Sequence, residues 1–401
     1  MAIDIYLPWA LAQLGRGMLL PVVPLYLRDQ GMSYTQVTAV IAALGVGAVL
    51  GGLPAGALVG RSGPPALFAG AIAAMAVTTV LLGVSTSVIA LAVFRITYGV
   101  GSVGIRIASQ IMVAHAAAAH MRGRRMSLLG GVNRMVFFVG PLLGGFLVDT
   151  VGYRTTFLAS GVATALGMAP TIAAHRRLTT EPKPQERTQG SVLQALRRNR
   201  KLVLLAGFGP ALVMTVRTGR QVVVPLIGDD LGLTATQVGA IVAVGTGADV
   251  LLFPVAGWLM DRFGRLFAIV PAFLLFAVGL LILGVTTTVT GAVVAGVVMG
   301  VGNGMSAGTM MTLGADLAPP EPGPFFAALG TMQNLGVILG PIMVGWLADA
   351  AGLRTSAVVL AVVMTAAIGW IVLFLGDTAS PRRPWLVASL LRSQNHSASA
   401  D

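Results

Sequence analysis

The 401-residue chain contains no cysteine and little charge. The absence of cysteine excludes disulfide bonds and thiol catalysis. Only 10% of the residues are charged, whereas about 25% are charged in a typical soluble domain. Hydrophobic residues make up 56% of the chain, and the mean hydropathy is +0.86. This composition predicts a protein that lies in a lipid bilayer.

Sequence support for several other chemistries is also missing. There is no phosphate-binding P-loop, so ATP-driven pumping is not supported. The Gly-x-Ser-x-Gly stretch at Gly304–Gly308 lies within a predicted apolar span and not at the strand-to-helix turn of a serine hydrolase, so serine hydrolysis is not supported either. The four histidines, at positions 115, 120, 175 and 396, map to predicted cytoplasmic ends or the tail, so we expect no metal site and no cofactor. The first ten residues lack the basic stretch and the cleavage site of a signal peptide, so we expect the first span to be retained.

The apolar residues form runs of about 20, the length that crosses ~30 Å of hydrocarbon as a helix. We predict twelve spans, at approximately 5–26, 36–58, 66–84, 88–113, 126–148, 155–174, 202–226, 236–259, 266–285, 289–314, 325–347 and 355–375. The runs are continuously apolar, whereas the strands of a membrane barrel alternate and have about ten residues. The predicted fold class is therefore an all-α polytopic membrane protein.

The chain repeats itself. VVPLYLRDQGMSYTQV at 22–37 returns as VVPLIGDDLGLTATQV at 223–238, with nine of sixteen positions identical. Gly140-Pro141 and Asp149 likewise match Gly340-Pro341 and Asp349, at an offset of 200. Each copy holds six spans, an even number, so both copies enter the membrane from the same face. We therefore expect two pseudo-symmetric six-helix bundles with a ligand site between them.

The repeat and the charges together predict the domains and the topology. The N-terminal bundle is expected at 1–174 and the C-terminal bundle at 202–376, with a cytoplasmic linker at 175–201 and a cytoplasmic tail at 377–401. Seventeen of the 26 Lys and Arg residues lie on one side of the predicted membrane, and three arginines lie in the opposite loops: Arg28, Arg154 and Arg354. The positive-inside rule then places both termini in the cytoplasm of a multi-pass plasma (inner) membrane protein.

The short turn after the eighth span carries GWLMDRFGR, from Gly257 to Arg265. This stretch resembles the G-x-L-x-D-R-x-G-R motif of the major facilitator superfamily, and the twelve spans and the duplication agree with that resemblance. The resemblance implies that Asp261 caps a neighbouring helix. It also implies that Arg262 and Arg265 bridge the two halves when the cytoplasmic side is closed.

The first half has a weaker counterpart of this motif. It begins at Gly56 and keeps Arg61, but Gly60 and Pro64 stand where the superfamily has an aspartate and a basic residue. The resemblance therefore implies a cytoplasmic gate that is held loosely on this side.

Spans four and five contain two further segments of this resemblance. Arg95 to Gly101 looks like the superfamily's R-x-x-Q-G-x-G segment, with Tyr98 where glutamine is usual. In span five, a proline and three glycines resemble the end of an exporter motif: Gly140, Pro141, Gly144 and Gly145. Proline removes a backbone hydrogen bond and glycine permits close helix approach, so a bendable, tightly packed seam is predicted. The chain thus resembles the twelve-span proton-coupled exporters, the drug:H+ antiporters.

Six arginines lie within the predicted spans, where each would cost about 2.5–3.5 kcal/mol if it faced lipid at the bilayer centre. Arg16 and Arg217 hold equivalent places, each eight residues before the matched Pro24 and Pro225. We predict that this pair clamps an anionic group, because a guanidinium stays charged and binds carboxylate or phosphate through two hydrogen bonds. Such a clamp resembles the arginine pairs of organophosphate exchangers in the same superfamily. The other candidate substrate-binding residues are Gln13, Arg106, Arg134 and Arg220.

Several of these assignments have alternatives. Arg106 and Arg134 lie near enough to the cytoplasmic ends to reach the interface, so a structural role fits each equally well. Asp249, the one acid within the spans, could carry a proton, neutralise a cation or pair with an arginine. Arg95 could serve proton coupling or helix packing.

Together these observations predict a secondary active transporter, not an enzyme, that works by alternating access. We expect proton-coupled efflux of an organic anion or anionic amphiphile. The alternative is a broad-specificity drug:H+ antiporter for neutral or cationic compounds held at Asp249. An intramembrane enzyme acting on lipid headgroups would need clustered His, Asp or Glu, and the acids are scattered. We expect a working monomer whose partners are a small molecule, protons and lipid, and no nucleic acid.

Overall fold

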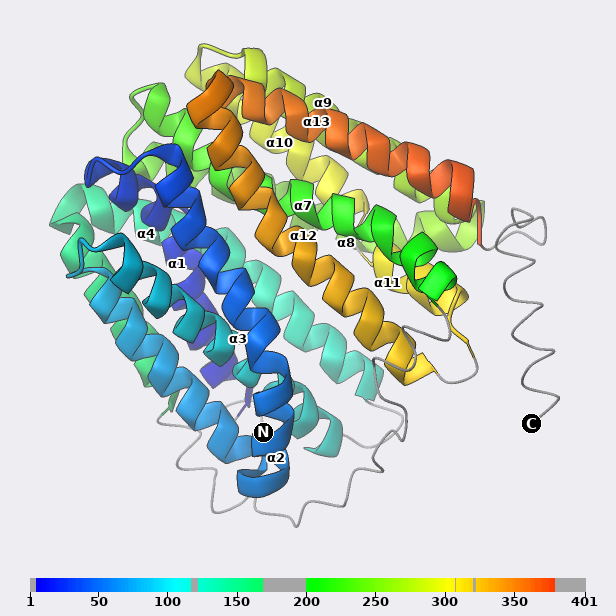
Figure 1. Ribbon diagram of the computed structural model, residues 1–401, viewed down its shortest axis with the longest axis horizontal. Helices are drawn as coiled ribbons and strands as arrows, with labels where there is room; N and C mark the ends of the chain where they lie inside the picture. Colours follow the sequence, from blue (N-terminus) through cyan, green and yellow to red (C-terminus); the bar gives the residue numbers. More distant parts are fainter. Residues whose placement is uncertain (1–4, 117–121, 169–199, 307, 320–321, 379–401) are drawn as a thin grey trace. The chain divides into compact units, whose positions relative to one another are not determined.

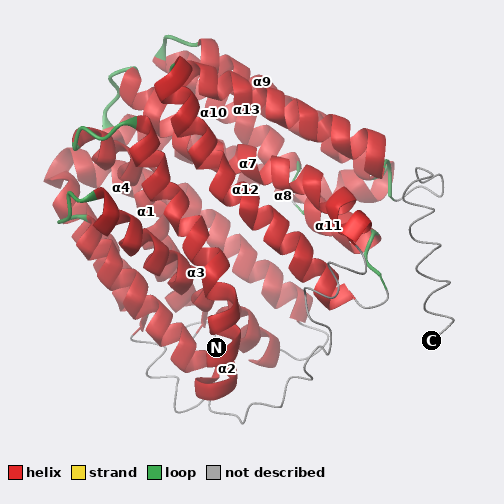
Figure 2. Ribbon diagram, viewed as in Figure 1, coloured by secondary structure: helices red, strands yellow, loops and turns green. Residues whose placement is uncertain are grey.

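The computed structural model describes residues 5–116, 122–168, 200–306, 308–319 and 322–378. Over these residues the chain consists of helices joined by short turns, with no strand (Figures 1 and 2). Most of the predicted linker and tail lies outside the described residues. The all-α prediction is confirmed.

The helices of the first half are α1 (Leu7–Asp29), α2 (Tyr34–Leu82), α3 (Val88–Ala116) and α4 (Arg122–Leu166). Those of the second half are α7 (Arg200–Asp230), α8 (Ala235–Phe263), α9 (Arg265–Val285), α10 (Val289–Met305), α11 (Thr309–Asp316), α12 (Pro322–Ala351) and α13 (Leu353–Trp370), followed by a π-helical turn at Ile371–Leu375. Helices α2 and α4 each contain a kink, at Gly63 and Gly152, where φ is +77° and +79°. Glycine adopts this left-handed conformation without the steric penalty of a Cβ atom.

Eleven helical segments of the described chain are long and apolar enough to cross a membrane. One of them, Leu128–Leu166, has 39 residues, about twice the length of a single crossing, and it contains the kink at Gly152. It therefore accounts for the predicted fifth and sixth spans, and the prediction of twelve fits the structure. The predicted tenth span is interrupted, because α10 ends at Met305 and α11 begins at Thr309.

The described chain packs as two compact units, and neither unit is one sequence repeat alone. Unit 1 contains the helices up to residue 168 together with Gln221–Thr246 and Pro341–Leu353. Unit 2 contains residues 200–220, Gly247–Gly340 and 354–378. Unit 1 therefore includes three helix ends from the second repeat, those of α7, α8 and α12. The two-bundle boundaries expected from the sequence stay a prediction.

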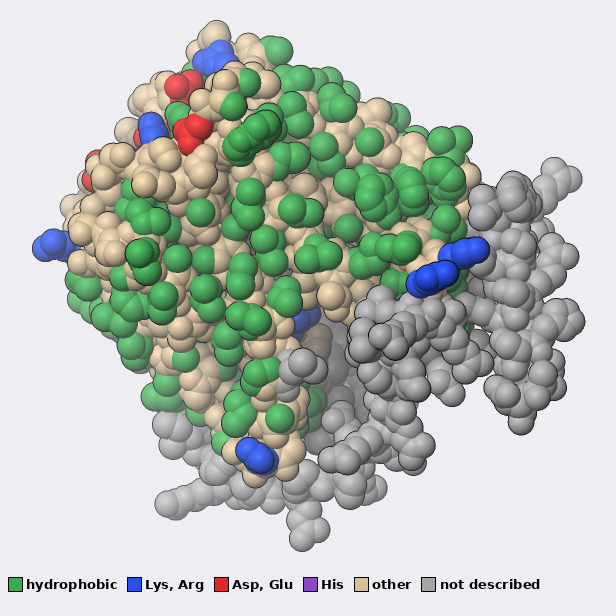
Figure 3. All heavy atoms as spheres, in the orientation of Figure 1, with side chains coloured by type: hydrophobic (Ala, Val, Ile, Leu, Met, Phe, Trp, Pro, Cys, Tyr) green, Lys and Arg blue, Asp and Glu red, His purple; other side chains and the backbone are tan. Residues whose placement is uncertain are grey.

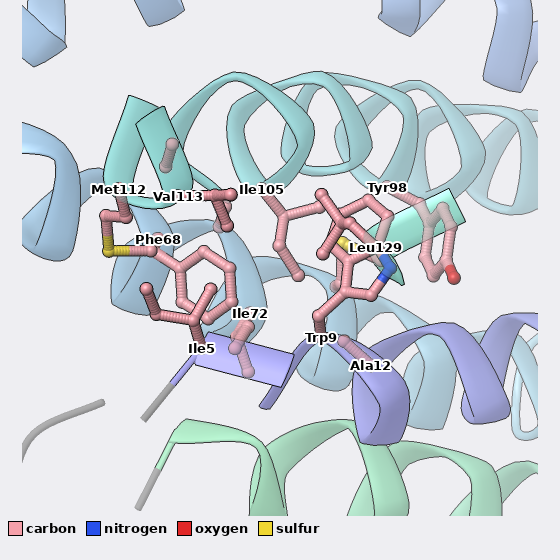
Figure 4. Close-up of a cluster of buried hydrophobic side chains, with 13 residues drawn as sticks. Ile5, Trp9, Ala12, Phe68, Ile72, Tyr98, Ile105, Met112, Val113 and Leu129 are labelled. Carbon is pink, nitrogen blue, oxygen red and sulfur yellow. The ribbon is translucent and has the colours of Figure 1, made fainter. Parts of the chain in front are cut away.

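Inside unit 1, α1 packs against α4 and α2 packs against α3. One apolar cluster joins these helices (Figure 4), and its largest members include Trp9, Phe68, Ile72 and Tyr98. In unit 2, α9 packs against α10. Burying these side chains fixes the positions of the helices that carry the polar residues considered below.

Many large apolar side chains also point outward. Ile89 and Leu251 are each 78% exposed, and hydrophobic side chains are spread over the visible face (Figure 3). A soluble monomer rarely exposes apolar patches of more than a few hundred Å². These faces suit contact with lipid.

A close backbone contact between α2 and α3 at Gly99 leads to a prediction for stability. A Cβ atom at Gly99 would overlap the carbonyl oxygen of Leu44, while a Cβ atom at Gly52 would meet nothing within 4 Å. We expect Gly99→Ala to lower the free energy of unfolding in detergent by about 1–3 kcal/mol through overpacking. The matched control, Gly52→Ala, should leave thermal unfolding unchanged or slightly raise the midpoint. Equal midpoints for the two variants would contradict the close packing of α2 on α3.

Candidate substrate site

Helix α1 presents two of the candidate substrate residues in unit 1, Gln13 and Arg16. Gln13 is buried, and its Nε2 donates to Oδ1 of Asn133 on α4 at 2.5 Å. The helices approach closely here, because Ser160 Oγ donates to the carbonyl oxygen of Gly15 at 2.7 Å. This contact holds the polar face of α1 against α4. Sequence reasoning missed Asn133, although its position beside Arg134 was a signal.

The glycines of the exporter-like segment lie at the same seam. Gly140 lies against Gly17 of α1, and Gly144 lies against Met18. In each case an added Cβ atom would overlap the α1 backbone. Gly145 instead faces Ala235, at the start of α8.

Three arginines of unit 1 gather in one electrostatic neighbourhood. Arg16 lies within electrostatic range of both Arg95 and Arg106. The Arg16 guanidinium is 5.7 Å from the ring centre of Phe137, and that of Arg95 is 5.8 Å from the ring centre of Tyr98. Arg16 is half-buried, Arg95 is buried and Arg106 is exposed. Among the described residues, no carboxylate forms an ion pair with any of the three.

Buried hydrogen-bonding atoms in this region also lack a partner among the described residues. They are Trp9 Nε1, Gln13 Oε1, Arg95 Nε and the Tyr98 hydroxyl. Trp9 on α1 and Tyr98 on α3 belong to one cluster with Leu129 of α4 (Figure 4). Indole and guanidinium nitrogens only donate hydrogen bonds, and a phenol can donate. The interior of unit 1 is therefore rich in donors and positive charge.

Unit 2 has a different electrostatic arrangement, centred on Asp249 of α8. Asp249 is buried, and its Oδ2 accepts a hydrogen bond from Asn303 Nδ2 of α10 at 2.8 Å. Arg220 of α7 lies within electrostatic range of Asp249, and its guanidinium is 5.3 Å from the ring centre of Phe276. Asp249, the one acid within the predicted spans, therefore has a hydrogen-bond donor and a cation as neighbours.

Arg217 is held by a second polar residue of the same region. Its Nη2 donates to Ser306 Oγ at 2.7 Å, and Ser306 Oγ donates to the carbonyl oxygen of Asn303 at 2.9 Å. Ser306 is the C-cap residue that directly follows the end of α10 at Met305, so the break between α10 and α11 positions it. Sequence reasoning missed Asn303 and Ser306. The sequence did offer a signal for Asn303: it is a polar residue in a glycine-rich apolar span, and it corresponds to Ser102 of the first repeat.

The two repeats have diverged in charge. At the repeat offset, Arg16 alone of the four arginines in the first-half spans has an arginine counterpart, Arg217. Asp249 corresponds to Ala48. Arg134 lies on α4 and is half-buried. Arg16 belongs to unit 1 and Arg217 to unit 2, so a clamp formed by the pair stays a prediction.

The motif at Gly257–Arg265 forms a network inside unit 2. The Arg265 Nε is 3.1 Å from Asp316 Oδ2, and its Nη1 is 3.5 Å from Asp261 Oδ1. The backbone N–H of Arg265 donates to Asp377 Oδ1 at 3.1 Å, and Thr378 Oγ1 donates to Asp316 Oδ2 at 2.6 Å. Arg265 therefore ties the start of α9 to the end of α11. The Arg262 guanidinium instead lies 5.6 Å from the ring centre of Trp258.

The first-half counterpart of this motif lies within α2. Gly56 is a helical residue with nothing within 4 Å of a Cβ atom built on it, and Arg61 is exposed. Bridging of the halves by these motifs, as the resemblance implies, stays a prediction.

Solved structures of transporters share this architecture. A bacterial homologue of the human lysosomal transporter Spinster, in an inward-facing conformation, superposes with a TM-score of 0.74 at 14% identity and covers 98% of this chain and 97% of its own. The nucleoside transporter NupG superposes with a TM-score of 0.72 at 13% identity, covering 92% and 99%. The shared fold is that of a polytopic helical membrane protein.

The family follows from the sequence match. The model of the Major Facilitator Superfamily matches residues 9–218 and 206–392, so the chain belongs to this superfamily. It is a multi-pass membrane transporter of small molecules, not an enzyme.

Curated relatives include an uncharacterised transporter of this superfamily from Methanocaldococcus jannaschii, 22% identical over 85% of this chain and 89% of its own. The quinolone resistance protein NorA of Staphylococcus aureus is 23% identical over 39% of each chain. The efflux pump aflT of Aspergillus parasiticus is 35% identical over 23% of this chain and 18% of its own. Each of these two efflux-related matches covers only part of the chain.

The hydrogen bond between Asn303 and Asp249 generates a prediction of coupling. Asn303→Leu leaves a buried carboxylate without this donor, which should cost about 1–3 kcal/mol of unfolding free energy. Asp249→Leu should lower the free energy of unfolding less when it is added to Asn303→Leu than when it is made in the wild type. In the double variant both partners are apolar, so neither leaves a buried polar group behind. Detergent unfolding of the two single variants and the double variant measures the difference. Strictly additive losses would show that the two side chains do not stabilise each other.

Proposed function

We propose that this transporter exports an organic anion or an amphiphile with an anionic head. The carrying observation is the group of Arg16, Arg95 and Arg106 in unit 1, which has no carboxylate partner among the described residues. Arg95 is buried, and a buried positive charge needs a partner or water because it is costly in a low-dielectric interior. A bound anion would supply the missing partner.

The orphaned donors support the same ligand class. Trp9 Nε1 and Arg95 Nε can only donate hydrogen bonds, and no acceptor for these two buried atoms lies among the described residues. Carboxylate and phosphate oxygens accept several such bonds, and a charge-assisted bond is roughly twice as strong as a neutral one. A neutral oxygen can also accept these bonds, but it does not offset the positive charge of Arg95.

In this proposal, Arg16 and Arg217 hold the anion, and Arg220 and Gln13 assist. Arg106 and Arg134 extend the positive surface that the ligand meets. Asp249 takes up and releases the coupling proton, and Arg95 influences that step through its charge. The direction is export, which the similarity to efflux proteins supports.

A broad-specificity drug:H+ antiporter remains the second candidate. Its supporting observation is the buried Asp249, a carboxylate that could neutralise a cationic compound. NorA, named for quinolone resistance, also resembles part of this chain. In this alternative, Arg220 and Asn303 would release Asp249 when the cation binds.

Transport of charge-matched compounds tests the proposal. Inside-out proteoliposomes with an acidic lumen would be given an anionic, a neutral and a cationic amphiphile of equal size. We expect uptake of the anion alone, and Arg16→Ala/Arg217→Ala should reduce it at least tenfold because the charge-assisted bonds are lost. The control Arg154→Ala/Arg354→Ala removes the same charge from the turns and should transport normally.

The outcomes separate the two candidates. Cation uptake that survives Arg16→Ala/Arg217→Ala and disappears in Asp249→Asn would establish the drug antiporter. Anion uptake unaffected by the loss of Arg16 and Arg217 would overturn the arginine site. Uptake that does not depend on the pH gradient would remove proton coupling from the proposal.

We further propose a monomer in the plasma membrane with both termini in the cytoplasm. The chain has no cysteine, so single cysteines can be introduced without background. Ser62→Cys lies in the predicted cytoplasmic turn after the second span, and Thr86→Cys lies in the predicted external turn after the third; both positions are exposed. In intact cells, a membrane-impermeant maleimide should label Thr86→Cys and spare Ser62→Cys. The reverse pattern would invert the topology.

A further inference from the structure

Two aspartates make matching contacts with the starts of two helices from the opposite repeat. Asp149, in α4 of the first repeat, accepts hydrogen bonds from the backbone N–H groups of Ala235 and Thr236 at 3.1 and 2.8 Å. These residues begin α8 of the second repeat. All of these atoms belong to unit 1.

The second contact mirrors the first. Asp349, in α12 of the second repeat, accepts from the backbone N–H groups of Tyr34 and Thr35 at 3.1 and 2.8 Å. These two residues begin α2 of the first repeat, and unit 1 also contains this contact. Each carboxylate uses one oxygen for each amide.

Each of these helix starts already has its own cap, and the aspartate completes it. In α2, Ser33 Oγ accepts from the Gln36 N–H at 3.2 Å, and Gln36 Oε1 accepts from the Ser33 N–H at 3.0 Å. In α8, Thr234 and Gln237 make the same pair of bonds at 3.3 and 3.0 Å.

This local cap satisfies two of the amides that a helix start leaves without a partner. In each helix the amides of the first and second helical residues remain, and these two bind the aspartate. A negative charge at this position is further stabilised by the positive end of the helix dipole.

Glycine lies one helical turn before each aspartate and permits the approach. A Cβ atom at Gly145 would overlap the carbonyl oxygen of Ala235, and one at Gly345 would overlap the Thr38 side chain. Two segments are present in both repeats: S/T-x-T-Q-V and Gly-x-x-x-Asp. At each contact, the first segment of one repeat meets the second segment of the other. Neither aspartate is part of the exporter-like segment at Gly140–Gly145.

We propose that Asp149 and Asp349 form a paired latch, which joins the two repeats at one membrane face and must release each time that face opens. This face carries the turns after the first, third and fifth spans, opposite the GWLMDRFGR turn. Three features suit a reversible latch: the partners are backbone amides at helix ends, the two carboxylates are exposed, and each helix keeps its own capping box after release. A latch of this kind would act whatever the substrate is.

Distances across this face test the latch. Val84→Cys and Val285→Cys are equivalent positions of the two repeats, both exposed, and can carry spin labels. Double electron–electron resonance on the otherwise complete chain would compare wild type with Asp149→Asn/Asp349→Asn. Asparagine keeps one acceptor oxygen and loses the charge, so the ratio of open to latched molecules should rise about tenfold or more.

Controls separate a latch from a stabilising cap. Asp29 makes no hydrogen bond to another helix among the described residues, so Asp29→Asn removes a charge from the same face and should leave the distances unchanged. The single variants Asp149→Asn and Asp349→Asn should each give an intermediate shift, and they provide the test if the double variant does not fold. Unchanged distances in folded single variants, with or without a lower unfolding midpoint, would overturn the latch. If transport shows that the substrate is not an anion, the same changes in spin-label distance are still expected.

Discussion

The structure depends on the requirement that backbone amides in a bilayer be satisfied by the protein itself. Helices meet this requirement along their length and fail to meet it in their first turns. The starts of α2 and α8 show how the chain solves the problem: a local cap supplies part of the acceptors and a carboxylate from another helix supplies the rest. Helix starts thereby become the places where distant segments of sequence are joined.

The second constraint is that a charge buried in the membrane needs polar or charged neighbours, and the two units meet it differently. In unit 2, Arg217 donates to Ser306, and Asp249 binds Asn303 within range of Arg220. In unit 1, Arg16 and Arg95 have aromatic neighbours, and no carboxylate among the described residues forms an ion pair with either of them. Unit 2 thus holds its buried charges beside polar partners, whereas Arg16 and Arg95 of unit 1 lie beside aromatic rings. Duplication supplied the symmetric scaffold, and substitution at single positions supplied the difference.

Glycine explains how such long helices pack without large side chains between them. At Gly99 the α3 backbone lies against α2, and at Gly140 and Gly144 the α4 backbone lies against α1. Close backbone contact compensates for the weak hydrophobic drive between helices in lipid, where van der Waals packing carries the association. The same contacts hold the polar faces of α1 and α4 in register, so that Gln13 reaches Asn133.

The sequence by itself determined the class of this protein. Apolar runs of membrane length, the repeat and the turn motif predicted an all-α transporter of the superfamily, because these signals are local and depend on hydropathy and spacing. Only the tertiary structure revealed the partners of the charges. Asn303 beside Asp249, Ser306 beside Arg217 and the caps formed by Asp149 and Asp349 join residues 54 to 315 positions apart. Such pairs depend on how the helices pack and on where α10 ends. Neither can be predicted from the hydrophobic periodicity of the sequence.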